Sequence, residues 1–278
     1  MQKKDVCMLR HEHRQPDEPL VYYTFPLFDG SSDLACVVST RLGGVSTGAL
    51  RSLNLSFRTG DREEAVIENR SRLYNVLSIA AERVVQAQLV HDSHIEVVTK
   101  QTPLDAFYKF PTTDGLVTNL RNRALFIPVA DCAAIAFFDP FRQVIGMAHA
   151  GWKGVLHRIA ERMIETMHTV YGCHASDILV AVSPAIGPCC YQVREDLIAT
   201  FTQAFPQDAS RFFVPQPDDT IHLDLWAALR WQLLAAGIVP SHLEIAEVCT
   251  ACHTEEFYSH RAEQGKTGRF ASVIVLRA

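Results

Sequence analysis

Cys132 and His149 are the residues of this sequence whose types and spacing suggest chemistry most directly. They lie near the two ends of an apolar stretch, residues 125–154, that is interrupted by the sequence Asp139-Pro140-Phe141-Arg142. Asp and Pro are favoured at the first two positions of a tight turn, so the stretch predicts two strands that pair antiparallel. Closing the loop at this turn places Cys132 directly opposite His149, with Cβ atoms about 5 Å apart. A thiolate and an imidazole at that separation can share one metal ion or one proton.

Two further histidines offer another ligand for such a site. Residues 84–100 are typical of a strand, a break and a second strand, and His91 and His94 lie in the break. In an extended chain, residues three apart point to opposite faces, so at most one of the two joins a shared site. The alternative is that both are histidines of a surface loop.

Two segments have the composition of anion-binding sites. Residues 40–48, TRLGGVSTG, follow an expected strand, and their glycines can expose backbone N–H groups beside Arg41, a bidentate clamp. An ordinary glycine-rich turn is the alternative. Residues 149–154, HAGWKG, lead into an expected helix, so Lys153 would stand beside a helix N-terminus that attracts anions.

The remaining hydrophobic pattern predicts a mixture of strands and helices. We expect one domain over residues 20–278, after a polar N-terminal tail at residues 1–19, because the sequence contains no repeat, linker or low-complexity segment. The expected strands are residues 21–25, 34–39, 116–118, 178–183, 245–249 and 270–276, and the expected helices are residues 62–81, 155–171, 195–205 and 224–236.

Composition argues against several classes of partner. The net charge is −5, which gives no electrostatic case for binding nucleic acid or an anionic membrane. Residues 1–19 contain no apolar core of a secretory signal, and the apolar run at 124–138 is interrupted by Asp131. We therefore expect a soluble, cytoplasmic protein whose eight cysteines are free thiols.

Four of the cysteines form short motifs. Cys249-Thr250-Ala251-Cys252-His253 matches the haem-attachment pattern, which requires an exported protein, and also half of a zinc knuckle. No second C-x-x-C or H-x-x-x-H segment complements it in the sequence. The neighbouring Cys189 and Cys190 could form a redox pair, but ordinary thiols are the simpler interpretation.

A series of motifs resembles, in order, those of the laccase-domain family, also called YfiH-like or multicopper polyphenol oxidase-like. Members of that family act as purine nucleoside phosphorylases. The pair Ala130-Asp131-Cys132 and His149-Ala150-Gly151-Trp152-Lys153-Gly154 is highly specific at this separation. The other matching segments are residues 40–46, 52–55, 60–61, 69–70, 90–91, 184–188, 249–250 and 257–259, with Arg261 and residues 268–269.

The resemblance implies a layered α+β domain with mixed sheets flanked by helices. It implies a metal site at His91, Cys132 and His149, which favours His91 over His94, and these three are also the expected catalytic residues. Three protein ligands leave one position of a zinc ion open, and Zn²⁺ is the expected cofactor, with Cu²⁺ as the alternative. Phosphate would be held by basic residues, for which the candidates are Arg41, Lys153 and Arg261. A regular strand would turn Asp131 away from Cys132, as a structural hydrogen-bond acceptor.

The function implied by the resemblance is zinc-dependent phosphorolysis of adenosine, inosine and 5'-methylthioadenosine, with adenosine deamination as a related activity. The partners would then be purine nucleosides and phosphate, and the protein a monomer or homodimer. The alternatives are a copper-dependent polyphenol oxidase and a non-catalytic metal-binding protein. A multicopper oxidase requires several histidine-rich motifs, whereas only His11 and His13 form H-x-H among the twelve histidines. One three-ligand site predicts one zinc per chain.

Overall fold

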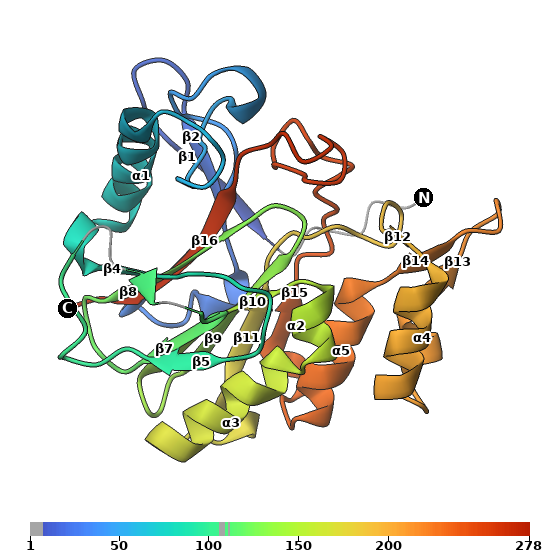
Figure 1. Cartoon of the computed structure of the whole chain (residues 1–278). Helices are drawn as coiled ribbons and strands as arrows, with labels where there is room; N and C mark the ends of the chain where they lie inside the picture. Colours follow the sequence, from blue (N-terminus) through green and yellow to red (C-terminus); the bar gives the residue numbers. More distant parts are fainter. Residues whose placement is uncertain (1–7, 106–108, 111) are drawn as a thin grey trace.

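Two β-sheets stacked face to face form the centre of the fold, and helices cover their outer faces (Figure 1). The computed structural model describes residues 8–105, 109–110 and 112–278. Apolar side chains from both sheets, among them Ile127, Phe138 and Ile274, fill the space between the sheets. This layered arrangement of mixed sheets and flanking helices confirms the predicted α+β class.

The larger sheet has seven strands and the smaller has six. The order of the larger sheet is β1 (Leu9–His13), β2 (Leu20–Thr24), β3 (Leu34–Ser39), β16 (Phe270–Leu276), β8 (Ala124–Val129), β4 (Val84–Ala87) and β6 (Lys109–Phe110). The order of the smaller sheet is β15 (Leu243–Ile245), β11 (Leu179–Val182), β9 (Ala133–Asp139), β10 (Val144–Ala150), β7 (Gly115–Thr118) and β5 (Ile95–Val97). Both sheets are mixed, because β4 runs parallel to β8 and β11 runs parallel to β15.

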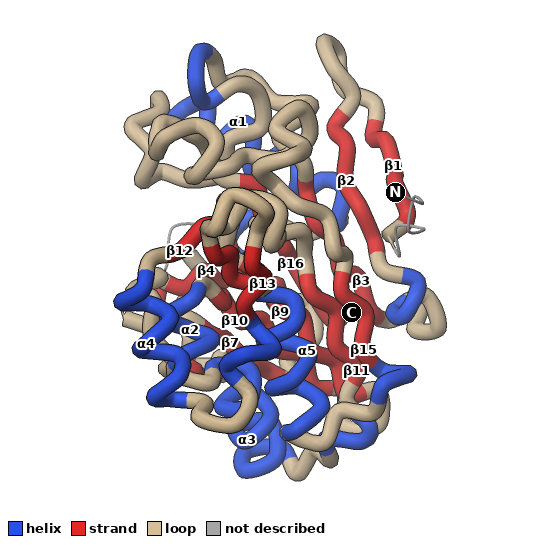
Figure 2. Tube along the Cα trace, turned by 90° about the vertical axis from the view of Figure 1, so that its right-hand side faces the viewer, coloured by secondary structure: helices blue, strands red, loops and turns tan. Residues whose placement is uncertain are grey.

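Helices lie on both outer faces of the stacked sheets. The helices are α1 (Glu63–Leu77), α2 (Trp152–Leu156), α3 (Ile159–Tyr171), α4 (Glu195–Ala204) and α5 (Leu225–Ala235). Leu73 of α1 packs against the seven-stranded sheet, while Met163 of α3 and Leu229 of α5 pack against the six-stranded sheet. Figure 2 shows α1 apart from the other helices, which gather on the opposite side. A third, small sheet contains β12 (Gln192–Val193), β14 (Ile221–Leu223) and β13 (Phe213–Pro215).

The hairpin of β9 and β10 forms, but the predicted register is wrong by two residues. His149 pairs with Ala134, and Asp139 remains in the ladder opposite Val144. The cause is the Asp139 side chain, whose Oδ1 accepts the backbone N–H groups of Phe141 and Arg142 at 2.9 Å each. These bonds stabilise a four-residue loop that begins after Asp139 rather than before it. A shift of two residues keeps every side chain on its predicted face.

The residues before the hairpin do not continue as one long strand. The chain leaves the seven-stranded sheet at Val129 and enters the six-stranded sheet at Ala133, so β8 and β9 belong to different sheets. Asp131, in the crossing between them, has a φ of 82°. This left-handed conformation turns the chain sharply, and the regular strand expected around Asp131 is therefore wrong.

The remaining differences are at the ends of elements. The helix expected at residues 155–171 is two helices, α2 and α3, because Arg158 between them has a φ of 59°. The strand expected at residues 245–249 is β15, which ends at Ile245. Strand β1 lies within the range expected as a polar tail and pairs with β2. Among the described residues, no helix combines the length and apolar character needed to cross a membrane.

Candidate metal and substrate site

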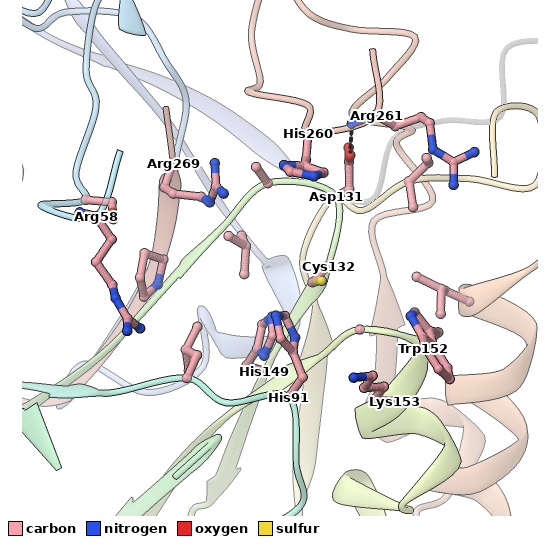
Figure 3. A pocket seen from close by; sticks show the side chains of 18 of the residues that line it. Arg58, His91, Asp131, Cys132, His149, Trp152, Lys153, His260, Arg261 and Arg269 are labelled. Carbon is pink, nitrogen blue, oxygen red and sulfur yellow. Dashed lines mark hydrogen bonds between the residues drawn. The ribbon is translucent and has the colours of Figure 1, made fainter. Parts of the chain in front are cut away.

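His91, Cys132 and His149 come together from three separate segments. His149 is in β10, Cys132 immediately precedes β9, and His91 lies in the loop that follows β4. Their candidate ligand atoms all lie within 4.8 Å of one another. The two imidazole rings have centroids 4.9 Å apart, and Figure 3 shows the three side chains converging. The register shift in the hairpin leaves the pair together because Cys132 and His149 remain on one face.

Asp114, immediately before β7, holds both histidines in place. Its Oδ1 accepts hydrogen bonds from His149 Nδ1 at 2.8 Å and from the backbone N–H of His91 at 3.0 Å. Its Oδ2 accepts the backbone N–H groups of Val90 and Asp92 at 3.1 and 2.9 Å. A proton on Nδ1 of His149 is thereby fixed, which leaves Nε2 of that ring as the atom that could bind a metal ion.

Gly151 allows the thiol of Cys132 to approach the chain closely. A Cβ atom built on Gly151 would lie 2.8 Å from Cys132 Sγ and 3.8 Å from His91 Nδ1. The first distance is shorter than a carbon and a sulfur atom tolerate, so any side chain at this position would displace the thiol. The glycine is therefore required by the close packing of the three residues.

The electrostatics differ between the two histidines. Burial lowers the pKa of His149, but the adjacent Cys132 and Asp114 outweigh it and raise that pKa to about 9. His91 has the opposite shift, since burial and the neighbouring His149 lower its pKa. In the metal-free protein these shifts favour a protonated His149 and a neutral His91.

The donor set fits a zinc ion. Two imidazole nitrogens and one thiolate are common zinc ligands, and a carboxylate that orients a metal-bound histidine is a frequent supporting feature. Asp114 supplies that carboxylate to His149. Three protein ligands also leave one position open for a substrate or water, as in catalytic zinc sites.

The three residues open onto a cavity of about 570 Å³. This volume is in the range of small-molecule binding pockets. Trp152 and Tyr191 contribute aromatic side chains to its lining, and burial raises the pKa of Tyr191, which keeps its phenol protonated. Basic side chains also line the cavity: Arg58, Lys153, His260, Arg261 and Arg269. In Figure 3, Arg58 and Arg269 lie on one side of Cys132, and Lys153 and Trp152 on the other.

Of the three predicted phosphate-binding residues, Lys153 and Arg261 line the cavity and Arg41 does not. Arg41 Nη1 donates to Glu263 Oε1 at 3.0 Å and to the carbonyl of Thr254 at 2.7 Å. Its guanidinium also lies over the ring of Tyr258, 4.3 Å from the centroid. Arg41 therefore connects the glycine-rich loop to the C-terminal segment. This structural role agrees with the alternative interpretation of residues 40–48 as an ordinary glycine-rich turn.

Asp114, Arg58 and Arg269 line or support the site but were not predicted from the sequence. Asp114 precedes a glycine, as many turn residues do, and nothing in the local sequence shows that its carboxylate reaches a distant loop. Arg269 follows Gly268 in a motif of the resemblance, and that proximity was the available signal. Its Nη1 donates to the carbonyls of Thr267 and Gly268 at 3.2 and 2.7 Å.

Asp131 serves as a hydrogen-bond acceptor that joins neighbouring loops. Its Oδ1 accepts from Thr250 Oγ1 and its Oδ2 accepts from the backbone N–H of Arg261, each at 2.7 Å. Its own carbonyl accepts the N–H of Ile186 at 2.8 Å. These bonds join Asp131 to Ile186 and Arg261, which also line the cavity.

Comparisons with known proteins identify the family of this chain. The model of the family described as multi-copper polyphenol oxidoreductase laccase matches residues 35–277. The purine nucleoside phosphorylase YlmD of Geobacillus stearothermophilus is 37% identical over 241 residues, which cover 85% of this chain and 88% of that protein. A purine nucleoside phosphorylase of Deinococcus radiodurans is 38% identical over 239 residues, covering 86% of this chain and 87% of that protein.

Solved structures show the same fold. The crystal structure of YlmD from Geobacillus stearothermophilus superposes with a TM-score of 0.87 at 34% identity and covers 97% of this chain and 100% of that one. The crystal structure of a Bacillus licheniformis protein, YfiH, gives a TM-score of 0.86 at 32% identity and covers 96% of this chain and 99% of that one.

Proposed function

The chain belongs to the multi-copper polyphenol oxidoreductase laccase family, and we propose that it is a zinc-dependent purine nucleoside phosphorylase of the cytoplasm. The proposed substrates are adenosine, inosine and 5'-methylthioadenosine. The observation that carries the proposal is the convergence of His91, Cys132 and His149 at a cavity that also contains several cations. The names of the similar proteins support the same reaction.

In the proposed reaction, a phosphate oxygen forms a bond to the anomeric carbon of the ribose as the bond to the purine nitrogen breaks. The electron pair of that bond leaves with the base. The products are the free base and ribose 1-phosphate, or the 5-methylthio derivative of that sugar phosphate when 5'-methylthioadenosine is the substrate. The sugar is cation-like during the transfer, so the site must hold an anion beside it and stabilise the departing base. Both needs can be assigned to residues of the cavity.

Arg269, Lys153 and Arg58 are the cations best placed to hold phosphate. Arg269 is half-buried, and its Nη1 is fixed by two carbonyl oxygens, which orients the guanidinium. An oriented guanidinium binds phosphate in a bidentate manner. Lys153 and Arg58 are exposed at the cavity and add positive charge. Arg261 is a further candidate, although its Nη1 donates to the carbonyl of Gln192 at 3.0 Å.

Trp152 and Tyr191 would receive the purine, because flat aromatic surfaces favour stacking with a base. The raised pKa of Tyr191 keeps a proton on its hydroxyl, which can donate a hydrogen bond to the departing base. His91, Cys132 and His149 would hold the metal. When bound, the metal would act as a Lewis acid toward negative charge that develops in the reaction.

The test is incubation of the protein with inosine, with and without inorganic phosphate, while hypoxanthine and ribose 1-phosphate are measured. Phosphorolysis requires that base release depend on phosphate concentration and that ribose 1-phosphate form in equal amount. Formation of free ribose would show that water attacks, and the protein would then be a hydrolase. Phenol oxidation that requires added copper, with no base release, would favour the polyphenol oxidase alternative. A parallel incubation with adenosine reports deamination through the appearance of inosine.

A further inference from the structure

Four cysteines that are distant in the sequence meet at a second place in the fold. Cys189 and Cys190 lie in the loop between β11 and β12, and Cys249 and Cys252 lie in the segment after β15. Their sulfur atoms all lie within 4.8 Å of one another. The Cys190 and Cys252 sulfurs are 3.4 Å apart although the residues are 62 positions apart along the chain. This four-cysteine cluster shares no residue with the site at His91, Cys132 and His149.

Backbone hydrogen bonds hold the two segments of the cluster in register. The N–H of Ala185 donates to the carbonyl of Val248 at 3.2 Å, and the N–H of Thr250 donates to the carbonyl of Ala185 at 3.1 Å. Gly187 lets the segments approach, because a Cβ atom there would lie 2.5 Å from the Trp226 ring and 3.2 Å from Cys249 Cβ. The surrounding fold thus holds the two cysteine-containing segments beside each other.

The contacts among the sulfurs favour a shared ion over a disulfide. Cys252 Sγ is 3.5 Å from Cys189 Sγ and 3.4 Å from Cys190 Sγ, so one sulfur has two equivalent neighbours. A disulfide would use one of these neighbours and leave the other thiol beside it. Four thiolates around one zinc at about 2.3 Å have sulfur–sulfur separations of about 3.8 Å, within the range seen here.

The backbone also favours negative charge on Cys249. Cys249 is buried, and its Sγ accepts the N–H of Gly187 at 3.2 Å. An N–H group that points at a buried sulfur stabilises a thiolate, the form that binds metal. Cys249 and Cys252 also have the C-x-x-C spacing of zinc knuckles, and the vicinal pair supplies the two ligands that the sequence seemed to lack.

We propose that Cys189, Cys190, Cys249 and Cys252 form a structural zinc site. All four ligands come from the protein, so this site is closed, in contrast to the open three-ligand site at the cavity. The expected zinc content therefore rises from one to two ions per chain.

The position of the cluster suggests what the second zinc stabilises. Ile186 and Tyr191, which flank the vicinal cysteines in sequence, line the substrate cavity. Thr250, between the other two cysteines, is joined through Asp131 to the backbone of Arg261, which also lines the cavity. The zinc would cross-link the two segments that form this wall of the cavity.

The test counts zinc per chain by elemental analysis in the purified protein and in three variants. We expect two equivalents in the wild-type protein, one in the Cys132→Ala variant and one in the Cys190→Ser/Cys252→Ser double variant. Cys173→Ala is the matched control and should retain two, because this buried thiol belongs to neither cluster. A wild-type content of one zinc that is lost in Cys132→Ala would overturn the proposal.

Two further measurements keep the test decisive if the double variant fails to fold. Cobalt reconstitution of the Cys132→Ala variant should give a strong thiolate-to-metal charge-transfer band. Among the residues that the structure describes, only the four-cysteine cluster could then supply this band; absence of the band would refute the site. Alkylation under non-reducing conditions should leave the four thiols protected until zinc is removed by a chelator. A disulfide among them in the isolated protein would contradict the proposal. These results do not depend on turnover, so they are independent of the proposed reaction.

Discussion

Replacement of Asp114 by Asn should impair the three-residue site although no proposed ligand is changed. The carboxylate of Asp114 accepts four hydrogen bonds, two at each oxygen. An asparagine has one acceptor oxygen and one amide group that only donates. The variant must therefore lose two of the four hydrogen bonds, and the orientation of the amide decides which two are lost.

Each orientation of the amide has a distinct cost. If the oxygen faces His149, the amide group opposes the N–H groups of Val90 and Asp92, and two unsatisfied donors cost about 2–6 kcal/mol. If the amide group faces His149, Nδ1 of that ring must accept, and its proton moves to Nε2, the proposed ligand atom. Loss of such a supporting partner lowers metal affinity about 10–100-fold, or about 1.4–2.7 kcal/mol.

The assay is zinc competition against a chelator of known affinity, together with thermal unfolding of the metal-free protein. Asp114→Asn should weaken zinc binding at the three-residue site about 10–100-fold or lower Tm, according to the orientation adopted. Asp92→Asn is the matched control, since it makes the same chemical change on a side chain that is 61% exposed in the loop of His91. Wild-type zinc affinity and wild-type Tm in Asp114→Asn would refute the role assigned to this carboxylate.

Three more predictions concern other residues. The pKa of His149 is raised to about 9 in the metal-free protein, so below that pH a zinc ion must displace the proton of this imidazole. The zinc affinity measured by competition should therefore rise about tenfold per pH unit and level off above pH about 9. Gly151→Ala should push the Cys132 thiol from its place and weaken zinc binding at least about tenfold while circular dichroism stays unchanged; unchanged affinity would contradict the packing argument. Arg269→Gln should raise the KM for phosphate about tenfold, whereas Arg41→Gln should lower Tm and leave that KM unchanged, as steady-state kinetics and thermal unfolding can show.

The strands and helices with strong local patterns could be predicted from the sequence. Strands β3 and β16 begin and end where the hydrophobic pattern predicts, since their residues are buried along their whole length. The shared face of Cys132 and His149 was also predictable, because alternation along a strand survives a shift of two residues. The register of the β9–β10 hairpin was not predictable, because it depends on which backbone N–H groups donate hydrogen bonds to the Asp139 side chain.

Features that depend on contacts between distant segments could not be predicted locally. In the sequence, Asp114 precedes a glycine like an ordinary turn residue, and only the fold brings the loop of His91 beside it. Arg41 lies in a loop whose composition is typical of an anion-binding site, but in the fold its guanidinium forms an ion pair with the Glu263 carboxylate. The same limit applies to the four-cysteine cluster, since neither cysteine pair suggests the other in sequence.

The most direct test of the proposed function is the rate of ribose 1-phosphate formation from inosine and phosphate in wild-type, Cys132→Ala and Cys173→Ala proteins loaded with zinc. If the metal held by His91, Cys132 and His149 is required, Cys132→Ala should lose turnover while its circular dichroism spectrum remains that of the wild type. Cys173→Ala should retain turnover, because its thiol lies outside both cysteine-containing clusters. Ribose 1-phosphate formation at the wild-type rate in a folded Cys132→Ala protein would contradict the assignment of this site.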